Sequence, residues 1–235
     1  MTETKTPGDP AIRAVAFDAV GTLIHPDPPA AAVYAAIGQR FGSQLDVAEI
    51  RRRFGAAFAE QERLDAQNSL ATSEERERRR WRDIVAQVLD DVADPAGCFA
   101  ELYAHFAQPD AWRVDEGAGD VLGRLQRSGL PIALASNYDH RLHGVIRGLE
   151  ELAAIRTIVI SSEIGWRKPS PRFFAHLTRA MDVPAKAVLY VGDDLANDFE
   201  GARQAGLTAM LFDPQRRHPG LGSERLGKFG DLRLP

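Results

Sequence analysis

Short apolar runs and longer segments of helical periodicity alternate along most of this chain of 235 residues. A buried strand appears as a brief apolar run bounded by turn residues, whereas an amphipathic helix repeats its apolar residues every three or four positions. Strands are predicted at 12–17, 131–135, 155–160, 187–191 and 208–212, and helices at 117–128, 140–152, 171–181 and 197–205. Strands that alternate with helices form a parallel sheet covered on both faces. The pattern therefore predicts an α/β fold.

One block of the chain, residues 30–111, breaks this alternation because its periodicity is helical throughout. Helices are predicted at 30–41, 47–64, 72–88 and 96–107. Thr72 and Glu75 have the spacing of a capping box, so Thr72 is the expected N-cap of the third helix. The block therefore has the character of an inserted helical domain.

The boundaries of this block define the expected domain organisation. Residues 25–29 include three prolines, which break regular structure and mark one boundary. We predict a core formed by residues 11–24 and 115–235, with an inserted helical domain of residues 25–114. The residues after Asp213 are expected to be mostly loop.

Composition and charge limit the class of protein. Hydrophobic residues make up 44% of the chain, enough for a substantial core, and the net charge is −4, which favours neither nucleic acid nor an anionic membrane as partner. The single cysteine, Cys98, is expected to be a small buried apolar residue and suits a reducing compartment. Residues 1–10 are polar, which predicts a frayed tail without a signal-peptide core, and no apolar run reaches the ~20 residues that cross a bilayer. We expect a cytoplasmic protein; no signal of an oligomeric state is evident.

The stretch from Val15 to Leu23 carries the first candidate chemistry. Its apolar strand ends at Asp18, and residues just past the carboxyl ends of parallel strands line the ligand crevice of such a sheet. Gly21 permits a tight turn, and Thr22 brings a hydroxyl close to the Asp18 carboxylate. An Asp that only caps a turn after a buried strand is also common, so this stretch alone leaves both interpretations open.

Carboxylates also follow the strand predicted at 187–191, as Asp193, Asp194 and Asp198. The carboxyl ends of parallel strands meet at one edge of a sheet, so these groups can converge with Asp18. Adjacent acids at a buried strand end repel each other unless a cation offsets their charge. Mg²⁺ prefers such oxygen ligands, and Asp18 and Asp193 would supply them, with Asp194 or Asp198 in an outer position.

Two further elements provide groups that suit a phosphate. Ser136 and Asn137 follow the strand at 131–135, and Lys168 precedes the helix at 171–181. Ser136, with backbone N–H groups near it, would form a short anion-binding nest, and Lys168 would stabilise the charge of a transferring phosphoryl group. Each residue alone also has a structural explanation, Ser136 as a helix N-cap and Lys168 as a surface lysine. Together the four elements meet the needs of phosphoryl transfer.

The run Phe17-Asp18-Ala19-Val20-Gly21-Thr22-Leu23 closely resembles the first motif of the haloacid dehalogenase-like (HAD) hydrolase superfamily, and the order and spacing of the other elements resemble its remaining motifs. The resemblance implies a Rossmann-like core with an α-helical cap inserted after the first motif. It implies Mg²⁺ as cofactor and a small phosphorylated metabolite as substrate. The site residues that it implies are Asp18 as nucleophile and metal ligand, Thr22 in the same motif, Asp193 and Asp198 as further ligands, Ser136 and Asn137 at the phosphate, and Lys168 as charge stabiliser.

Val20 departs from the phosphatase branch of that superfamily, in which an Asp at this position acts as general acid and base. A valine side chain donates no proton, and general acid catalysis is worth ~10²–10⁴-fold. The backbone carbonyl of Val20 remains a candidate metal ligand, since only the side chain differs. One interpretation is a phosphohydrolase whose leaving groups need little protonation, or in which His25, Tyr138 or His140 replaces the acid.

Two other interpretations stay open. The first is a module that binds Mg²⁺ and phosphate without catalysis. The second is a metal-independent 2-haloacid dehalogenase, whose halide leaves without a proton, although the paired acids Asp193 and Asp194 weigh against it. Of the remaining charged and aromatic residues, the arginine-rich run at 76–80 is expected to be a solvated helix face, and Trp166 and Arg167 are candidates for substrate contact.

Overall fold

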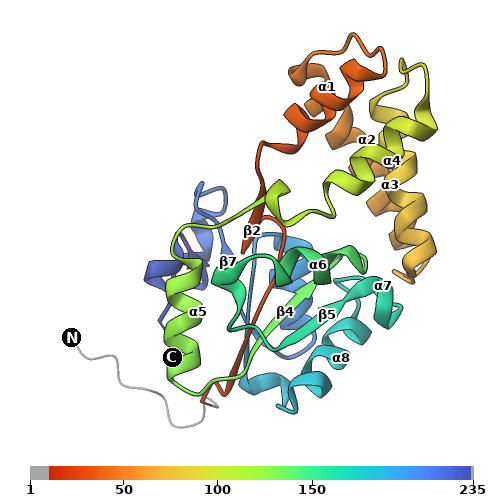
Figure 1. Cartoon of the computed structure of the whole chain (residues 1–235). Coiled ribbons are helices and arrows are strands. Elements are labelled where there is room, and N and C mark those ends of the chain that lie inside the picture. Colours follow the sequence, from red (N-terminus) through yellow and green to blue (C-terminus); the bar gives the residue numbers. More distant parts are fainter. Residues whose placement is uncertain (1–10, 234–235) are drawn as a thin grey trace.

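The computed structural model of the chain describes residues 11–233, so the tail expected at residues 1–10 lies outside the described part (Figure 1). A six-stranded sheet has the order β5-β4-β1-β6-β7-β8, and all neighbouring strands in it are parallel. The strands are β1 (Ala14–Phe17), β4 (Ile132–Ser136), β5 (Thr157–Ile160), β6 (Val188–Gly192), β7 (Thr208–Phe212) and β8 (Arg225–Leu226). The predicted α/β class with a Rossmann-like core is confirmed.

Helices cover both faces of this sheet, and the alternation of side chains along β1 explains how. Val15 and Phe17 point to the face covered by α5 (Ala118–Arg127) and α6 (Arg141–Arg147). Ala14 and Ala16 point to the other face, covered by α8 (Pro171–Met181) and α9 (Gly201–Gln204). The small alanines leave room on that face for Phe173 and Phe174 of α8, both fully buried.

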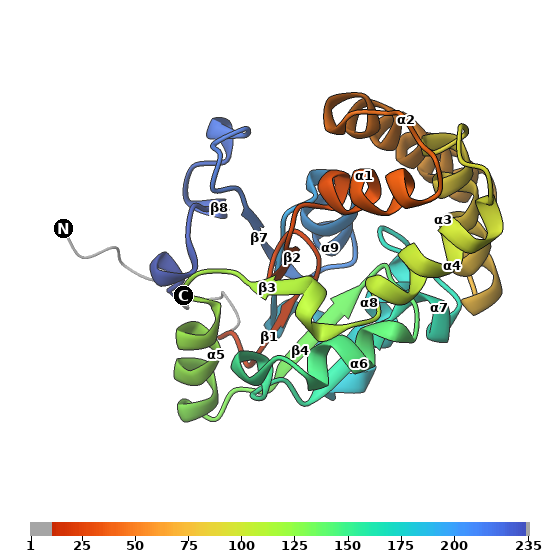
Figure 2. The same ribbon diagram turned by 45° about the horizontal axis from the view of Figure 1, so that its top comes forward.

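Four helices, α1 (Ala30–Arg40), α2 (Val47–Gln67), α3 (Glu74–Val88) and α4 (Pro95–His105), form a bundle beside the sheet (Figures 1 and 2). We call residues 30–105 the helical segment. It has a hydrophobic core of its own, in which Ile50, Ile84 and Cys98 are fully buried. The expected burial of Cys98 is confirmed. Among residues 11–233, no helix combines the length and the apolar character needed to cross a membrane.

A two-stranded antiparallel ribbon joins the helical segment to the sheet. It consists of β2 (Ile24–Pro26) and β3 (Trp112–Val114), so that both chain connections run side by side. The prediction that residues 25–29 lack regular structure is wrong for the first two of them. Pro26 is tolerated because it stands at the end of its strand, where its missing N–H disturbs the pairing least.

Three further details differ from the prediction. The N-cap of α3 is Ser73, whose Oγ accepts from the N–H of Arg76, because Thr72 instead donates its hydroxyl to Glu77. The loop expected after residue 213 contains the short edge strand β8. The helix predicted at 197–205 is a π-helical turn, η4 (Leu195–Glu200), that continues into α9. The remaining short helices are η1 (Pro109–Ala111), η2 (Glu150–Leu152), α7 (Ser161–Ile164), η3 (Ala185–Ala187), η5 (Pro219–Glu224) and η6 (Phe229–Asp231).

Candidate active site

The polar residues at the ends of three neighbouring strands lie side by side. Asp18 directly follows β1, Ser136 ends β4, and Asp193 directly follows β6, while β4, β1 and β6 are adjacent in the sheet. Together with Lys168, they line a cavity of about 360 Å³ between the sheet and the helical segment. The carboxyl edge of a parallel sheet is the usual place for such a ligand crevice. The convergence expected from the sequence is therefore found in the structure.

Lys168 is buried among oxygen atoms. Its Nζ donates to Asp18 Oδ1 and Asp198 Oδ1, each at 2.6 Å, and lies 2.9 Å from the Tyr190 hydroxyl and 3.2 Å from the Ala135 carbonyl oxygen. Burial alone would lower the pKa of Lys168, but the two carboxylates outweigh it and raise that pKa well above its ordinary value. Lys168 is therefore a fixed positive charge between two aspartates.

Asp18, Asp193 and Asp198 form a cluster in which one carboxylate oxygen of each lies within 4.8 Å of the others. Burial raises the pKa of Asp18 to about 7, and Lys168 offsets part of this effect. Burial and the charge of Asp198 raise the pKa of Asp193 to about 6. These carboxyls are crowded and desolvated, so a cation placed among them would favour their ionised forms.

Two glycines make room for this cluster. A Cβ at Gly21, which has a φ of +95°, would lie 2.5 Å from Asp193 Oδ2. A Cβ at Gly192 would collide with the carboxylate of Asp198. The backbone is therefore shaped to hold carboxylates at these two points. Three crowded carboxylates offer the hard oxygen donors that Mg²⁺ prefers, so the residues present fit this metal.

Two of the predicted site residues, Thr22 and Asn137, form hydrogen bonds to other residues of the site. Thr22 does not pair with Asp18 as expected; its buried hydroxyl donates to Asp193 Oδ1 at 3.2 Å, because the turn at Gly21 carries it toward β6. The side chain of Asn137 accepts from the N–H of Lys168 at 2.7 Å and donates to the carbonyl oxygen of Lys168 at 3.1 Å. Thr22 and Asn137 thus orient an aspartate and the lysine.

Asp194 and Asp198 are clearly distinguished in the structure. Asp194 Oδ1 accepts from the N–H groups of Ala196 and Asn197 and so caps η4. Asp198 is buried and contacts Lys168, with its second oxygen accepting from the N–H of Asp194 at 3.1 Å. Of the two, Asp198 is the one that joins the carboxylate cluster.

The side chains considered as replacement acids all have partners elsewhere. His25 Nε2 lies 2.8 Å from Asp115 Oδ2, and neither residue lines the cavity. Tyr138 lines the cavity, but its hydroxyl donates to the carbonyl oxygen of Phe106, and burial raises its pKa above the ordinary value. Val20 itself lines the cavity, and its side chain carries no group that could donate a proton.

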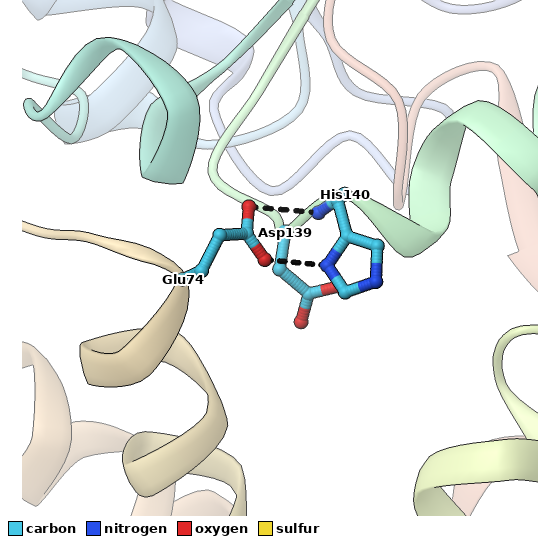
Figure 3. A group of neighbouring side chains, drawn as sticks. All are labelled: Glu74, Asp139 and His140. Carbon is cyan, nitrogen blue, oxygen red and sulfur yellow. Dashed lines mark hydrogen bonds and ion pairs between the residues drawn. The ribbon is translucent and has the colours of Figure 1, made fainter.

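His140 belongs to a contact between the helical segment and the part of the chain that forms the sheet (Figure 3). Glu74, at the start of α3, accepts from the N–H of His140 at 3.0 Å and faces its Nδ1 with the other oxygen. Glu74, Asp139 and His140 lie close enough to hold an ion, but both oxygens of Asp139 accept from Arg141. We therefore interpret this group as a contact between the helical segment and the part of the chain that forms the sheet.

The arginine-rich run at 76–80 is only partly a solvated face. Arg78 and Arg79 are exposed, as expected, but Arg80 is 1% exposed and lines the cavity. Arg80 donates to Asp65 and Glu62 of α2, so its burial is compensated by charge. The prediction is wrong for Arg80, because helical periodicity turns it toward α2.

Arg167 links this group to the site. It donates to Glu77 and Glu62 of the helical segment and directly precedes Lys168 in the chain. Its Nε lies 3.3 Å from Asp65 Oδ2 without an aligned hydrogen bond. We call Glu62, Asp65, Glu77, Arg80 and Arg167 the ion-pair network. Trp166, the other candidate for substrate contact, is not among the residues found to line the cavity.

Tyr190 is a site residue that sequence reasoning missed. It is fully buried in β6, and its hydroxyl donates to the Ala135 carbonyl oxygen at 3.0 Å and lies 3.1 Å from Asp198 Oδ1. A tyrosine in an otherwise aliphatic strand, two residues before Gly192, was the available signal. A buried phenol requires a polar partner, and the partner here is the lysine–aspartate group.

A parallel sheet with aspartates at the ends of β1 and β6 and a helical insertion after β1 defines a hydrolase of the haloacid dehalogenase type. A family model described as haloacid dehalogenase-like hydrolase matches residues 12–206, and the chain belongs to this family. It is 29% identical over 217 residues to the human haloacid dehalogenase-like hydrolase domain-containing protein 3, covering 88% of this chain and 85% of that protein.

Two solved structures show the same fold. One is a HAD-hydrolase from Bacillus subtilis bound to magnesium, with a TM-score of 0.75 and 18% identity over 95% of this chain and 97% of that one. The other is the L-2-haloacid dehalogenase RSc1362, with a TM-score of 0.72, 20% identity and the same shares of each chain. This architecture is therefore found both in a magnesium-bound HAD-hydrolase and in a haloacid dehalogenase.

Proposed function

We propose that the protein is a Mg²⁺-dependent phosphohydrolase that acts on a small phosphorylated substrate through an aspartyl-phosphate intermediate. The observation that carries this proposal is the cluster of Asp18, Asp193 and Asp198 oxygens within 4.8 Å of one another, with the Lys168 ammonium 2.6 Å from two of the carboxylates. Phosphoryl transfer needs this combination of a carboxylate, a fixed positive charge and a metal site.

In this proposal Asp18 is the nucleophile. Lys168 holds Oδ1, which leaves Oδ2 to attack phosphorus, so that an O–P bond forms as the ester P–O bond breaks and its electron pair stays on the leaving oxygen. Water then attacks the aspartyl phosphate, which releases inorganic phosphate and restores the carboxylate. Lys168 would stabilise the charge of both carboxylate and phosphoryl oxygens, and Ser136 with the N–H of Asn137 would hold the phosphate.

The metal would be held by Asp18, Asp193 and the backbone carbonyl of Val20, with Asp198 in an outer position. When bound, Mg²⁺ supplies positive charge beside the phosphoryl oxygens and allows the carboxylates to ionise together. Thr22 positions Asp193 through its hydroxyl. We also propose that residues 25–114 are a cap domain that closes the site from water, leaving residues 11–24 and 115–235 as the catalytic core.

Val20 determines which esters can react. Its side chain offers no proton, so the leaving oxygen departs as an anion and takes its proton from water. Reaction is then confined to esters of acidic alcohols, since ordinary alkyl esters lose the ~10²–10⁴-fold assistance of a general acid. The proposal therefore predicts hydrolysis of aryl phosphates and very slow hydrolysis of alkyl phosphates.

The test is steady-state hydrolysis of phenyl phosphate, with Mg²⁺ and with a chelator, by the wild type and by Asp18→Asn. We expect turnover only by the wild type with metal. Turnover retained by Asp18→Asn would refute the nucleophile assignment. Turnover unaffected by chelation would refute the metal requirement.

Val20→Asp separates catalysis from binding alone. We expect this variant to hydrolyse alkyl phosphates such as ethyl phosphate faster than the wild type by ~10²-fold or more. If the wild type hydrolysed no ester and Val20→Asp hydrolysed both kinds, the natural protein would be a phosphate- and Mg²⁺-binding module. No hydrolysis by either would contradict the phosphohydrolase proposal altogether.

A second candidate, a 2-haloacid dehalogenase, is favoured by the apolar side chain of Val20 at the cavity wall. It is disfavoured by the three carboxylates, because a metal-free reaction gains nothing from Asp193 and Asp198 beside Asp18. Release of chloride from 2-chloropropionate in the presence of chelator is the corresponding assay. Halide release without phosphatase activity would establish this candidate instead.

A further inference from the structure

The cavity changes character away from Asp18. On the side of the helical segment its wall includes five aromatic side chains that the protein itself leaves partly exposed: Phe54, Phe58, Trp81, Tyr103 and Phe106. Phe54 and Phe58 lie one turn apart on α2, with their rings stacked at 6.1 Å between centroids. Exposed aromatic surface inside a cavity gains contacts when the ring of a ligand covers it.

The cationic side chains of this wall already have partners. In the described part of the chain, the cations that line the cavity are Arg80, Arg141, Arg167 and Lys168, and each forms ion pairs with carboxylates. Six carboxylates line the same cavity. A bound Mg²⁺ and the doubly charged substrate phosphate would balance each other, but a further anionic group on the substrate would lie without a cation to offset its desolvation.

Besides the aromatic wall and the paired cations, Val20 limits which substrates fit the site, since it lines the cavity and cannot protonate a leaving oxygen. An aromatic ring attached to that oxygen spreads the negative charge and so replaces the missing acid. The same ring would fill the space beside Phe54 and Phe58. The aromatic wall of the cavity, its lack of an unpaired cation among the described residues, and the absence of a general acid at Val20 therefore favour the same kind of substrate, one with an uncharged aromatic leaving group.

We propose that the substrate class is an aryl phosphate monoester whose ring carries no anionic group. This inference rests on the proposed phosphohydrolase function and adds how the ring of the leaving group is recognised and that this ring is uncharged. The ester P–O bond breaks with its electron pair on the aryl oxygen, the aryloxide takes a proton from water, and the phosphoryl group passes to Asp18 and then to water. The ring lies against Phe54 and Phe58, which makes these two residues determinants of specificity.

The first experiment measures binding without catalysis. Isothermal titration in the presence of chelator compares 2-naphthol with 6-hydroxy-2-naphthoate, which has the same rings and one added carboxylate. We expect 2-naphthol to bind at least about ten-fold more tightly than the naphthoate. We expect Phe54→Ala and Phe58→Ala to weaken the binding of 2-naphthol several-fold. Leu64→Ala is the matched control, because Leu64 lies on the same helix, is 37% exposed and does not line the cavity.

The second experiment measures kcat/KM with Mg²⁺ for phenyl, 2-naphthyl and 3-carboxyphenyl phosphate, whose leaving groups have similar acidity. We expect the naphthyl ester to exceed the phenyl ester by about ten-fold, the factor for burying a second ring, and the carboxyphenyl ester to fall below it by a similar factor. The preference for the naphthyl ester should shrink in Phe54→Ala and Phe58→Ala and persist in Leu64→Ala.

The outcomes distinguish the two proposals. Equal binding of 2-naphthol and 6-hydroxy-2-naphthoate, or equal hydrolysis of the phenyl and carboxyphenyl esters, would overturn the proposed substrate class. Hydrolysis of ethyl phosphate by the wild type as fast as that of phenyl phosphate would overturn it as well, while supporting the phosphohydrolase. Selective binding of 2-naphthol without hydrolysis of any ester would support the recognition of an uncharged ring and refute the phosphohydrolase.

Discussion

Replacing Lys168 by methionine would test how the site is held together. Met retains most of the length of the lysine side chain but removes the charge, which lies 2.6 Å from Asp18 Oδ1 and from Asp198 Oδ1. The side chains of all three residues are at most 7% exposed, so water cannot replace the ammonium. The variant therefore leaves two buried carboxylates without their counter-ion.

The expected cost follows from this burial. Breaking a buried ion pair by removing one partner costs about 3–5 kcal/mol, because the other charge stays buried and uncompensated. For a chain of this size, 1 kcal/mol shifts Tm by about 2–4 °C, so we expect Lys168→Met to lower Tm by about 6–20 °C. The loss should be smaller at pH 5 than at pH 8, because burial raises the pKa of Asp18 to about 7 and protonation of this carboxyl removes part of the uncompensated charge.

The assay is thermal unfolding in chelator at both pH values, with urea unfolding at pH 8 for the free energy. Lys186→Met is the matched control, since Lys186 is exposed and its loss should change stability by less than about 0.5 kcal/mol. A variant as stable as the wild type at pH 8 would refute the reasoning. An equal loss at pH 5 and pH 8 would show that packing, and not charge, is responsible.

Three further predictions concern the metal site. Mg²⁺ should raise the Tm of the wild type at pH 8 but not that of Asp193→Ala, measured by differential scanning fluorimetry; an equal rise in both would remove Asp193 from the site. Burial raises the pKa of Asp18 to about 7 and of Asp193 to about 6, so the stability that these carboxyls contribute in chelator is present below about pH 4 and is lost as the pH rises through 6 and 7. The rise in Tm caused by Mg²⁺ should therefore be larger at pH 8 than at pH 5, and a rise independent of pH would contradict this linkage. Gly21→Ala should abolish the Mg²⁺-induced rise because its Cβ would displace the Asp193 carboxylate, whereas Gly42→Ala, at the same φ of +95° but in open space, should retain it; loss of the rise in both variants would attribute it to backbone strain.

The sequence alone predicts the sheet and the place of the site for a clear physical reason. In a parallel sheet, all strand ends of one sense meet at one edge, so Asp18, Ser136 and Asp193 are brought together by topology, whatever their separation in the chain. Predicting that these three residues lie close together therefore required no knowledge of side-chain packing. The same holds for the opposite faces of β1, which follow from the period of two along a strand.

The partners of individual side chains are less predictable because they depend on exact turns. Thr22 was expected at Asp18 and contacts Asp193, since the direction of its hydroxyl depends on the positive φ of Gly21. Arg80 was expected in solvent and is buried, since its partners Asp65 and Glu62 lie on another helix. Long-range pairing of this kind leaves no local signal, and the same applies to the ribbon of β2 and β3.

That ribbon has a mechanical consequence. The two chain connections pair with each other, so the helical segment is attached to the sheet by one ribbon and not by two independent linkers. The helical segment is also attached through the ion pairs of Arg167 with Glu62 and Glu77, through the contact of Glu74 with His140, and through backbone hydrogen bonds from Thr72 to Gly165 and from Arg167 to Leu70. The cavity therefore lies between two attachments of the helical segment, the ribbon and this group of contacts.

Breaking the ion pairs of Arg167 would move buried charges into water, where dissolved ions screen them. Salt would therefore weaken the attachment of the helical segment at this residue. The guanidinium of Arg167 forms these ion pairs, and its carbonyl carbon is bonded to the nitrogen of Lys168, whose ammonium contacts Asp18. The attachment of the helical segment and the position of Lys168 are in this way joined by one peptide bond.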